Sequence, residues 1–194
     1  MTQAGQGRTA LGKEDHIEVD GFRIRYWESS PPQPVGVVVM LAGMTWGLST
    51  LRDALAQTYR VMVLELPGCG TSAVNTRSQS VPALAQTMAQ AVAQAGSKHY
   101  TLIGTSFGAH VALWQTLQAP EQVEALVLIA PTALLPTAAP SGSTPATLAG
   151  RLLAHPEKAQ ECASLDPTSV AKEQALVQRL TGGRHDAEAE QRLG

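Results

Sequence analysis

The feature that most constrains this chain is a serine between two glycines, Gly-Thr-Ser-Phe-Gly at residues 104–108, which joins a strand pattern to a helix pattern. Residues 100–104 have the length and composition of a short buried strand. The apolar residues that follow recur at helical spacing until Pro120. The turn between these two elements must therefore be very tight. We expect it to hold Ser106 in a strained backbone conformation and to lift its hydroxyl clear of the sheet.

This pentapeptide also matches the G-x-S-x-G pattern of a serine nucleophile. Phe107 opens the helix, so its backbone N–H has no carbonyl partner one turn earlier and lies at the positive end of the helix dipole. A developing oxyanion would be stabilised there. The alternative is that Ser106 only caps the helix while the glycines close the turn. The strand before the motif and the helix after it favour the nucleophile.

The composition limits the other functions that the chain could have. With 194 residues, 44% hydrophobic and 15% charged, the sequence predicts one soluble globular domain with a sizeable core. A formal net charge of -2 and the absence of a basic stripe argue against a nucleic-acid partner. The apolar runs are only of strand length, and the N-terminus has no apolar signal region, so neither a membrane span nor secretion is expected.

The two cysteines, Cys69 and Cys162, have no metal-ligand spacing. We interpret them as reduced thiols in a cytoplasmic protein. No constellation of residues predicts a metal site or a cofactor, so the expected partner is a small-molecule substrate.

Apolar strand patterns alternate with helical patterns along most of the chain. We expect a disordered or loosely attached lead-in over 1–15, followed by a core over 16–131 that opens with a hairpin around Asp20-Gly21. The predicted strands then cover 35–41, 59–66, 100–104 and 123–130, and the predicted helices cover 49–57, 80–95 and the segment after Ser106. This alternation predicts an α/β fold with a doubly wound, mostly parallel sheet and helices on both faces.

Residues 132–194 have a different character. They begin with a linker rich in proline, serine and alanine and continue with short amphipathic segments near 147–154, 168–180 and 186–193. We expect a helical, cap-like segment over the sheet, or a helix pair packed on the side of the sheet.

A second glycine motif competes with the first. Residues 68–73, Gly-Cys-Gly-Thr-Ser-Ala, follow a strand and fit the bare form of a dinucleotide fingerprint. Pro67 precedes the motif, no clear helix begins after it, and no acidic residue ends a later strand at the expected distance. The sequence therefore does not favour a nucleotide site.

The order of these elements resembles the N-terminal part of the α/β-hydrolase superfamily, in its capped serine esterase, peptidase and C–C hydrolase group. The residues that carry the resemblance are the hairpin, the apolar strand with its glycine loop, the Glu-Leu-Pro-Gly-Cys-Gly-Thr-Ser segment at 65–72, and the serine motif. The resemblance implies a Ser-His-Asp hydrolase with Ser106 as nucleophile and the backbone N–H groups of Phe107 and Met44 as oxyanion hole. Ala42-Gly43 stands where the family usually has His-Gly. A serine at the nucleophile position argues against the dehalogenase and epoxide-hydrolase branches, whose members use an aspartate.

The loops around this motif supply the candidate substrate contacts. Gly43 and Trp46 are the pocket candidates in the glycine loop, and the pair Leu134-Leu135 could join them beneath the cap.

In the family the acid and the histidine follow strands that come after the cap. Here the sequence stops at Gly194 within the cap-like region, so we expect an incomplete domain whose C-terminal strands are missing and whose last strand lies near an open sheet edge. None of the five histidines suits a base for Ser106, and Asp166 fits a turn better than a catalytic acid. These histidines are His16, His99, His110, His155 and His185.

Three functions follow from these observations. The first is a serine hydrolase that cleaves an ester-like or related acyl bond through an acyl-enzyme, with low activity in this chain by itself because serine without a base is a poor nucleophile. The second is a non-catalytic ligand-binding module on a hydrolase scaffold. The third is an acyltransferase that uses the same acyl-enzyme. The sequence predicts no oligomeric state.

Overall fold

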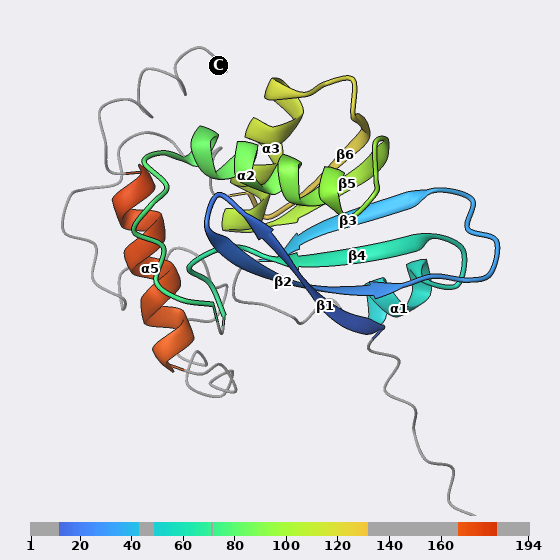
Figure 1. Cartoon of the computed structure of the whole chain (residues 1–194), viewed down its shortest axis with the longest axis horizontal. Coiled ribbons are helices and arrows are strands. Elements are labelled where there is room, and N and C mark those ends of the chain that lie inside the picture. Colours follow the sequence, from blue (N-terminus) through green and yellow to red (C-terminus); the bar gives the residue numbers. More distant parts are fainter. Residues whose placement is uncertain (1–11, 43–48, 71, 132–166, 182–194) are drawn as a thin grey trace, which may run out of the picture.

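The computed structural model of the chain describes residues 12–42, 49–70, 72–131 and 167–181, and it has one six-stranded sheet with helices on both sides (Figure 1). The strand order is β1-β2-β4-β3-β5-β6. The first two strands and the β2–β4 pair are antiparallel, and the other neighbours are parallel. The strands are β1 (Lys13–Val19), β2 (Phe22–Ser29), β3 (Val37–Ala42), β4 (Arg60–Glu65), β5 (Tyr100–Thr105) and β6 (Val123–Ile129). The predicted α/β fold with a mostly parallel sheet is confirmed.

Four helices are described: α1 (Ser49–Leu55), α2 (Val81–Gln94), α3 (Phe107–Gln118) and α5 (Pro167–Thr181). The two faces of the sheet hold separate cores. Because successive side chains of a strand point to opposite faces, Val39 and Leu41 of β3 join the larger core with α2 and α3, while Val38 and Met40 join the smaller core beside α1. A strand that is covered on both faces needs a continuous apolar run, which is what β3 has.

The opening hairpin turns at the predicted dipeptide. Asp20 (φ 51°) and Gly21 (φ 71°) both adopt positive φ, as a tight two-residue hairpin turn requires. The Oγ1 of Thr87 donates to Asp20 Oδ2 at 2.6 Å, which ties the tip of the hairpin to α2.

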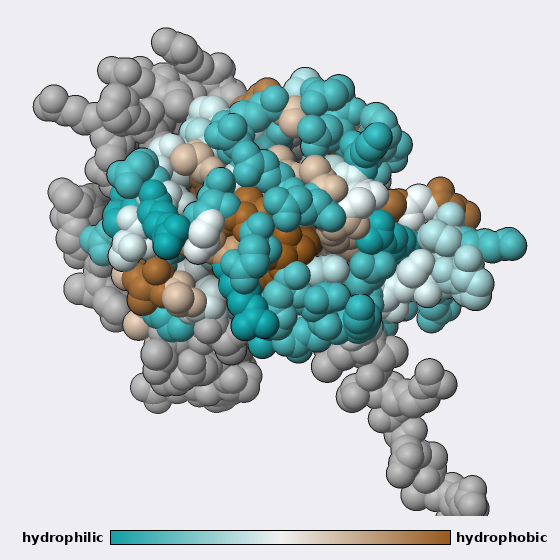
Figure 2. All heavy atoms as spheres, viewed as in Figure 1, coloured by the Kyte–Doolittle hydropathy of each residue, from teal (hydrophilic) through white to brown (hydrophobic). Residues whose placement is uncertain are grey.

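At the other end of the sheet, β6 pairs with β5 and with no other described strand. Its side chains are mostly half-buried or exposed, and Val127 is 43% exposed. The expectation that this apolar strand lies at a sheet edge holds for the described residues. Elsewhere, polar side chains cover most of the described surface on the face shown in Figure 2, with apolar side chains visible between them.

Helix α5 lies against the loop that connects β4 to α2 (Figure 1). Leu176 and Leu180 are buried and join the larger core. The Nζ of Lys172 donates to the carbonyls of Gly70 and Ser72, both at 3.1 Å. The helix expected at 168–180 is therefore present, and the other two segments expected in the tail lie outside the described residues.

The structure describes one of the two cysteines. Cys69 is buried in the loop after β4 and forms no disulfide with a described residue. Cys162 lies outside the described part of the chain.

Candidate active site

Ser106 is the single residue between the end of β5 and the start of α3. Its backbone has φ 54° and ψ -119°, a region that residues other than glycine rarely occupy. Backbone hydrogen bonds on both sides of the residue fix this conformation. The Ser106 N–H donates to the Ile129 carbonyl at 2.9 Å, and the Ser106 carbonyl accepts from the Ala109 N–H at 3.1 Å. The strained serine that the sequence predicted is present.

The side chain of Ser106 makes no capping hydrogen bond to α3 and is partly exposed. A serine that does cap a helix is available for comparison in the same molecule, since the Oγ of Ser80 accepts from the Ala83 N–H at the start of α2. The alternative that Ser106 only caps its helix is therefore not what the structure shows. Its hydroxyl is left available for another role.

Gly104 lets β5 and α3 come this close. A Cβ atom at Gly104 would lie 2.5 Å from the Cα of Ala109 and 2.6 Å from the carbonyl oxygen of Gly108. Both neighbours are backbone atoms of α3, which cannot move without moving the helix. The strand–serine–helix turn thus requires glycine at position 104.

The elbow lies at the carboxyl edge of the parallel strands. Gly104 of β5 is in register with Leu41 of β3, and Ala42 of β3 is in register with Glu65 of β4. Ligands of open α/β sheets bind at this edge. The sequence that follows β3 contains Gly43, Met44 and Trp46, and these three predicted site residues lie outside the described residues.

Phe107 is the first residue of α3, and its side chain is buried. An N–H at this position has no carbonyl one turn earlier in the helix and lies at the positive end of the helix dipole. The geometry that the sequence predicted for this residue is present. Whether its N–H binds an oxyanion stays a prediction.

No side chain of a described histidine forms a hydrogen bond with Ser106, and the bond between His110 and Ser106 joins the backbone N–H of His110 to the Ser106 carbonyl at 3.4 Å. His99 precedes β5 at its other end, where its Nδ1 lies 3.1 Å from the Glu121 carbonyl. His110 is 1% exposed and accepts a hydrogen bond from Trp114 Nε1 at 3.3 Å. His16 lies exposed on β1. The remaining candidates, His155, His185 and Asp166, lie outside the described residues.

The burial of His110 predicts a pH dependence of stability. Desolvation lowers its pKa from the ordinary 6.5 to about 4, so the folded protein keeps this ring neutral while the unfolded chain protonates it. Stability is therefore expected to fall as the pH drops from 6.5 towards 4, and to lose about 2 kcal/mol from this group between pH 7 and pH 5. In urea unfolding at these two pH values, His110→Gln should remove this part of the loss.

The matched control is His99→Gln, which removes an exposed histidine. It should leave the loss of stability between pH 7 and pH 5 unchanged. Equal pH dependence in wild type and His110→Gln would contradict the assignment of this loss to His110.

The structure shows a buried acid, Glu65, that the sequence analysis did not identify as a candidate functional residue. Glu65 is 1% exposed, and it accepts from Arg25 Nη2 and from the Ser72 N–H, both at 2.8 Å. A Cβ atom at Gly70 would lie 2.6 Å from Glu65 Oε2, so the loop passes directly over the carboxylate. The available signal was an acid at the end of an otherwise apolar strand pattern.

The same contacts explain the glycine motif at 68–73. Its glycines form a loop around Glu65, and α2 begins only at Val81, so they do not lead into a helix. The dinucleotide fingerprint requires a glycine turn that opens a helix.

The described residues contain no group of three or more histidine, cysteine, aspartate or glutamate residues that could hold a metal ion. No described helix is both long enough and apolar enough to cross a membrane.

Comparison with known proteins identifies the family to which the chain belongs. A model of the Alpha/beta hydrolase family matches residues 38–192. The pimeloyl-[acyl-carrier protein] methyl ester esterase of Nitrosomonas europaea is 38% identical over 80 residues, which cover 41% of this chain and 30% of that protein. The dihydrolipoyllysine-residue acetyltransferase component of the acetoin cleaving system of Cupriavidus necator is 28% identical over 117 residues, which cover 59% of this chain and 31% of that protein.

Among solved structures, Cfl2 of Burkholderia cenocepacia superimposes with a TM-score of 0.69 at 20% identity, covering 97% of this chain and 78% of that one. At this identity the likeness concerns the fold. The matches to the two curated relatives span less than a third of the length of each.

Proposed function

Because the chain belongs to the alpha/beta hydrolase family, we propose that it carries the nucleophile of a serine hydrolase that cleaves an ester-like or related acyl bond. In this proposal Ser106 Oγ attacks the acyl carbon, the alcohol leaves, and water then releases the acid from the acyl-enzyme. The matched esterase of N. europaea, by its name, acts on a methyl ester. The substrate proposed here is a small molecule with an acyl bond of that general kind.

The observation that carries the proposal is the backbone of Ser106. A non-glycine residue at φ 54° and ψ -119° costs about 1–3 kcal/mol, and such strain persists at functional sites where the surrounding structure enforces it. The strained serine is also partly exposed, makes no capping bond, and lies at the sheet edge where α/β proteins bind their ligands. Each of these properties suits a nucleophile.

We propose that the backbone N–H groups of Phe107 and Met44 stabilise the oxyanion of the tetrahedral intermediate. Phe107 supports this role by its position as the first residue of α3. Met44 follows β3 in the sequence, together with the pocket candidates Gly43 and Trp46, and β3 is the strand beside β5.

The base and the acid are proposed to come from chain outside the described residues. Serine requires a base to become nucleophilic at neutral pH. No side chain of a described histidine is hydrogen-bonded to Ser106, and the His110 ring is buried and contacts Trp114 and the ring of Phe107.

Covalent labelling of the whole protein tests the proposal. A fluorophosphonate probe forms a bond between phosphorus and an activated serine oxygen with loss of fluoride, and we expect mass spectrometry to find it on Ser106. Ser106→Ala should abolish the labelling. Ser30→Ala, which changes an exposed serine after β2, should not. No label on Ser106, under conditions that label a known serine esterase, would reject the proposed nucleophile.

A second candidate function is a non-catalytic ligand-binding module on the same scaffold. The observation that favours it is that no side chain of a described histidine or acid is hydrogen-bonded to the Ser106 side chain. This candidate predicts that a ligand which raises the melting temperature of the wild type raises that of Ser106→Ala equally. It also predicts no labelling of Ser106, so the two functions give opposite results.

A further inference from the structure

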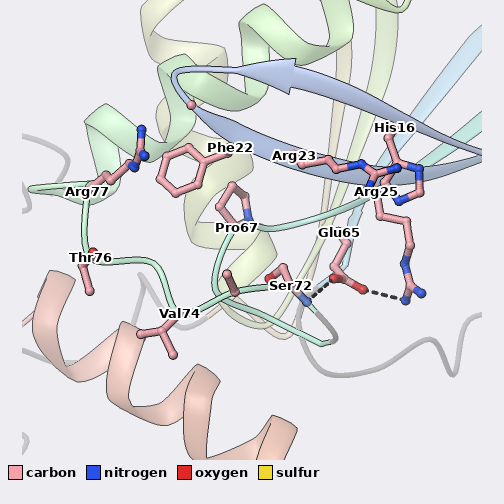
Figure 3. A pocket seen from close by; sticks show the side chains of 12 residues that line it. His16, Phe22, Arg23, Arg25, Glu65, Pro67, Ser72, Val74, Thr76 and Arg77 are labelled. Carbon is pink, nitrogen blue, oxygen red and sulfur yellow. Dashed lines mark hydrogen bonds and ion pairs between the residues drawn. The ribbon is translucent and has the colours of Figure 1, made fainter.

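A cavity of about 480 Å³ lies between the β1–β2 hairpin and the loop that follows β4 (Figure 3). Neither Ser106 nor Phe107 lines it. Cavities of this size hold small molecules. It is therefore a candidate binding site separate from the nucleophile.

The lining of this cavity is cationic. Three arginines line it, Arg23, Arg25 and Arg77, against one carboxylate, that of Glu65. Arg25 pairs with that carboxylate at 2.8 Å. The positive charge of the other two arginines is therefore not balanced by an acid within the lining.

Arg77 has no carboxylate partner among the described residues. Its Nη1 instead donates to the Asp20 carbonyl at 3.2 Å, and its guanidinium lies 5.7 Å from the centre of the Phe22 ring. A Cβ atom at Gly21 would lie 1.9 Å from Nη1, so the guanidinium occupies space that only glycine leaves open. The hairpin tip thus holds a charged group in place without neutralising it.

Arg23 is similarly weakly paired. Its only ion pair among the described residues is to Glu18 at 3.9 Å, with both side chains about 70% exposed. Exposed pairs of this kind contribute little. The Arg23 guanidinium is therefore available to an anion that enters the cavity.

Apolar surface separates the two charged ends. Figure 3 places Arg77 beside Phe22 at one end and Arg23 with Arg25 at the other, with Pro67 between them. Val74 completes this surface at the rim and is 66% exposed. A ligand that matches this lining has an anionic group next to an apolar body.

We propose that this cavity binds a small organic anion, in which a carboxylate or phosphate group adjoins an apolar group. The anionic group is held by Arg77, which forms charge-assisted hydrogen bonds with it, and the positive charge of Arg23 attracts it from the other end of the cavity. The apolar body lies on Phe22, Pro67 and Val74. Because the site excludes Ser106, binding does not depend on the proposed hydrolase chemistry.

Titration of the full 194-residue chain with phenyl phosphate tests the proposal. We expect saturable binding by calorimetry, with NMR shift changes confined to the hairpin and residues 72–77. Inorganic phosphate should bind at least fivefold more weakly because it lacks the apolar body, and neutral benzyl alcohol should not bind measurably. Raising the salt concentration should weaken the phenyl phosphate complex.

Substitutions locate the site. Arg77→Gln should raise the dissociation constant of phenyl phosphate at least threefold, and Arg23→Gln should raise it by a smaller factor because its charge acts from the other end of the cavity. Lys98→Gln removes an exposed cation that precedes β5 and does not line the cavity, and it should leave the dissociation constant unchanged. Two substitutions of Val74 test the site without changing either arginine, in case Arg77→Gln destabilises the hairpin. Val74→Glu should weaken binding at least threefold, and Val74→Lys should not weaken it.

The proposal would be overturned by the absence of saturable binding, by shift changes centred away from the hairpin, or by equal effects of Val74→Glu and Val74→Lys. Equal losses in Lys98→Gln and Arg77→Gln would likewise mean that only the overall charge of the chain attracts the probe.

Discussion

Replacing Ser106 by alanine in the whole protein is expected to lower the hydrolysis of an activated ester at least about a thousandfold. The alanine has no oxygen to attack the acyl carbon, so no acyl-enzyme can form. The backbone of this turn is fixed by hydrogen bonds of the Ser106 N–H and carbonyl, which alanine retains. The measurement is kcat/KM for a p-nitrophenyl ester, with Ser30→Ala as the surface control.

Glycine at the same position separates chemistry from strain. Ser106→Gly removes the nucleophile too, so its activity should be as low as that of Ser106→Ala. Glycine adopts φ 54° and ψ -119° without the steric cost that a Cβ imposes, so this variant should be about 1 kcal/mol more stable than Ser106→Ala. Retained esterase activity in either variant would end the assignment of Ser106 as nucleophile.

The largest loss of stability is expected from Gly104→Ala. The added methyl group would lie 2.5 Å from Ala109 Cα, a distance that real Cβ atoms do not show, and its neighbours are helix backbone rather than a flexible side chain. Strand β5 and helix α3 must separate to accept it, and both contribute residues to the larger core. We expect about 3 kcal/mol or more to be lost, measured by urea unfolding of the chain.

Gly36→Ala is the matched control for this substitution. There the nearest atom to an added Cβ is Tyr59 Cδ1 at 3.7 Å, an ordinary contact. Its free energy of unfolding should stay within about 0.5 kcal/mol of wild type. If Gly104→Ala were no more destabilising than Gly36→Ala, the close approach of strand and helix at the elbow would be wrong.

Gly104 and Ser106 show which part of the structure could be predicted from the sequence. Gly104 and Ser106 are neighbours in the chain, and the strand before them and the helix after them are each encoded by a local apolar period. The turn, its strained serine and the buried glycine could therefore be predicted without a structure. So could the hairpin, because Asp20-Gly21 is adjacent to both strands it joins and its two residues tolerate positive φ.

The contacts between distant segments could not be predicted in this way. Glu65 is 40 positions from Arg25, and they meet because β4 lies beside β2 in the sheet. The Arg77 side chain reaches the carbonyl of Asp20, 57 positions away, and Lys172 of α5 reaches Gly70 from 102 positions away. A local sequence pattern contains no information about which distant side chains will form these hydrogen bonds and ion pairs.

What the sequence by itself determined is therefore the local order of the elements, the family resemblance and the geometry of the Ser106 turn. The period of the apolar residues predicts which face of a helix or strand is buried. A glycine indicates where the backbone turns or where two backbone segments approach each other closely. What only the tertiary structure decided is the strand order, the burial of Glu65 under its loop, the seating of α5 and the arginine-lined cavity. These depend on side chains that become neighbours only when the sheet is assembled, because the free energy that selects them comes from packing between segments far apart in the chain.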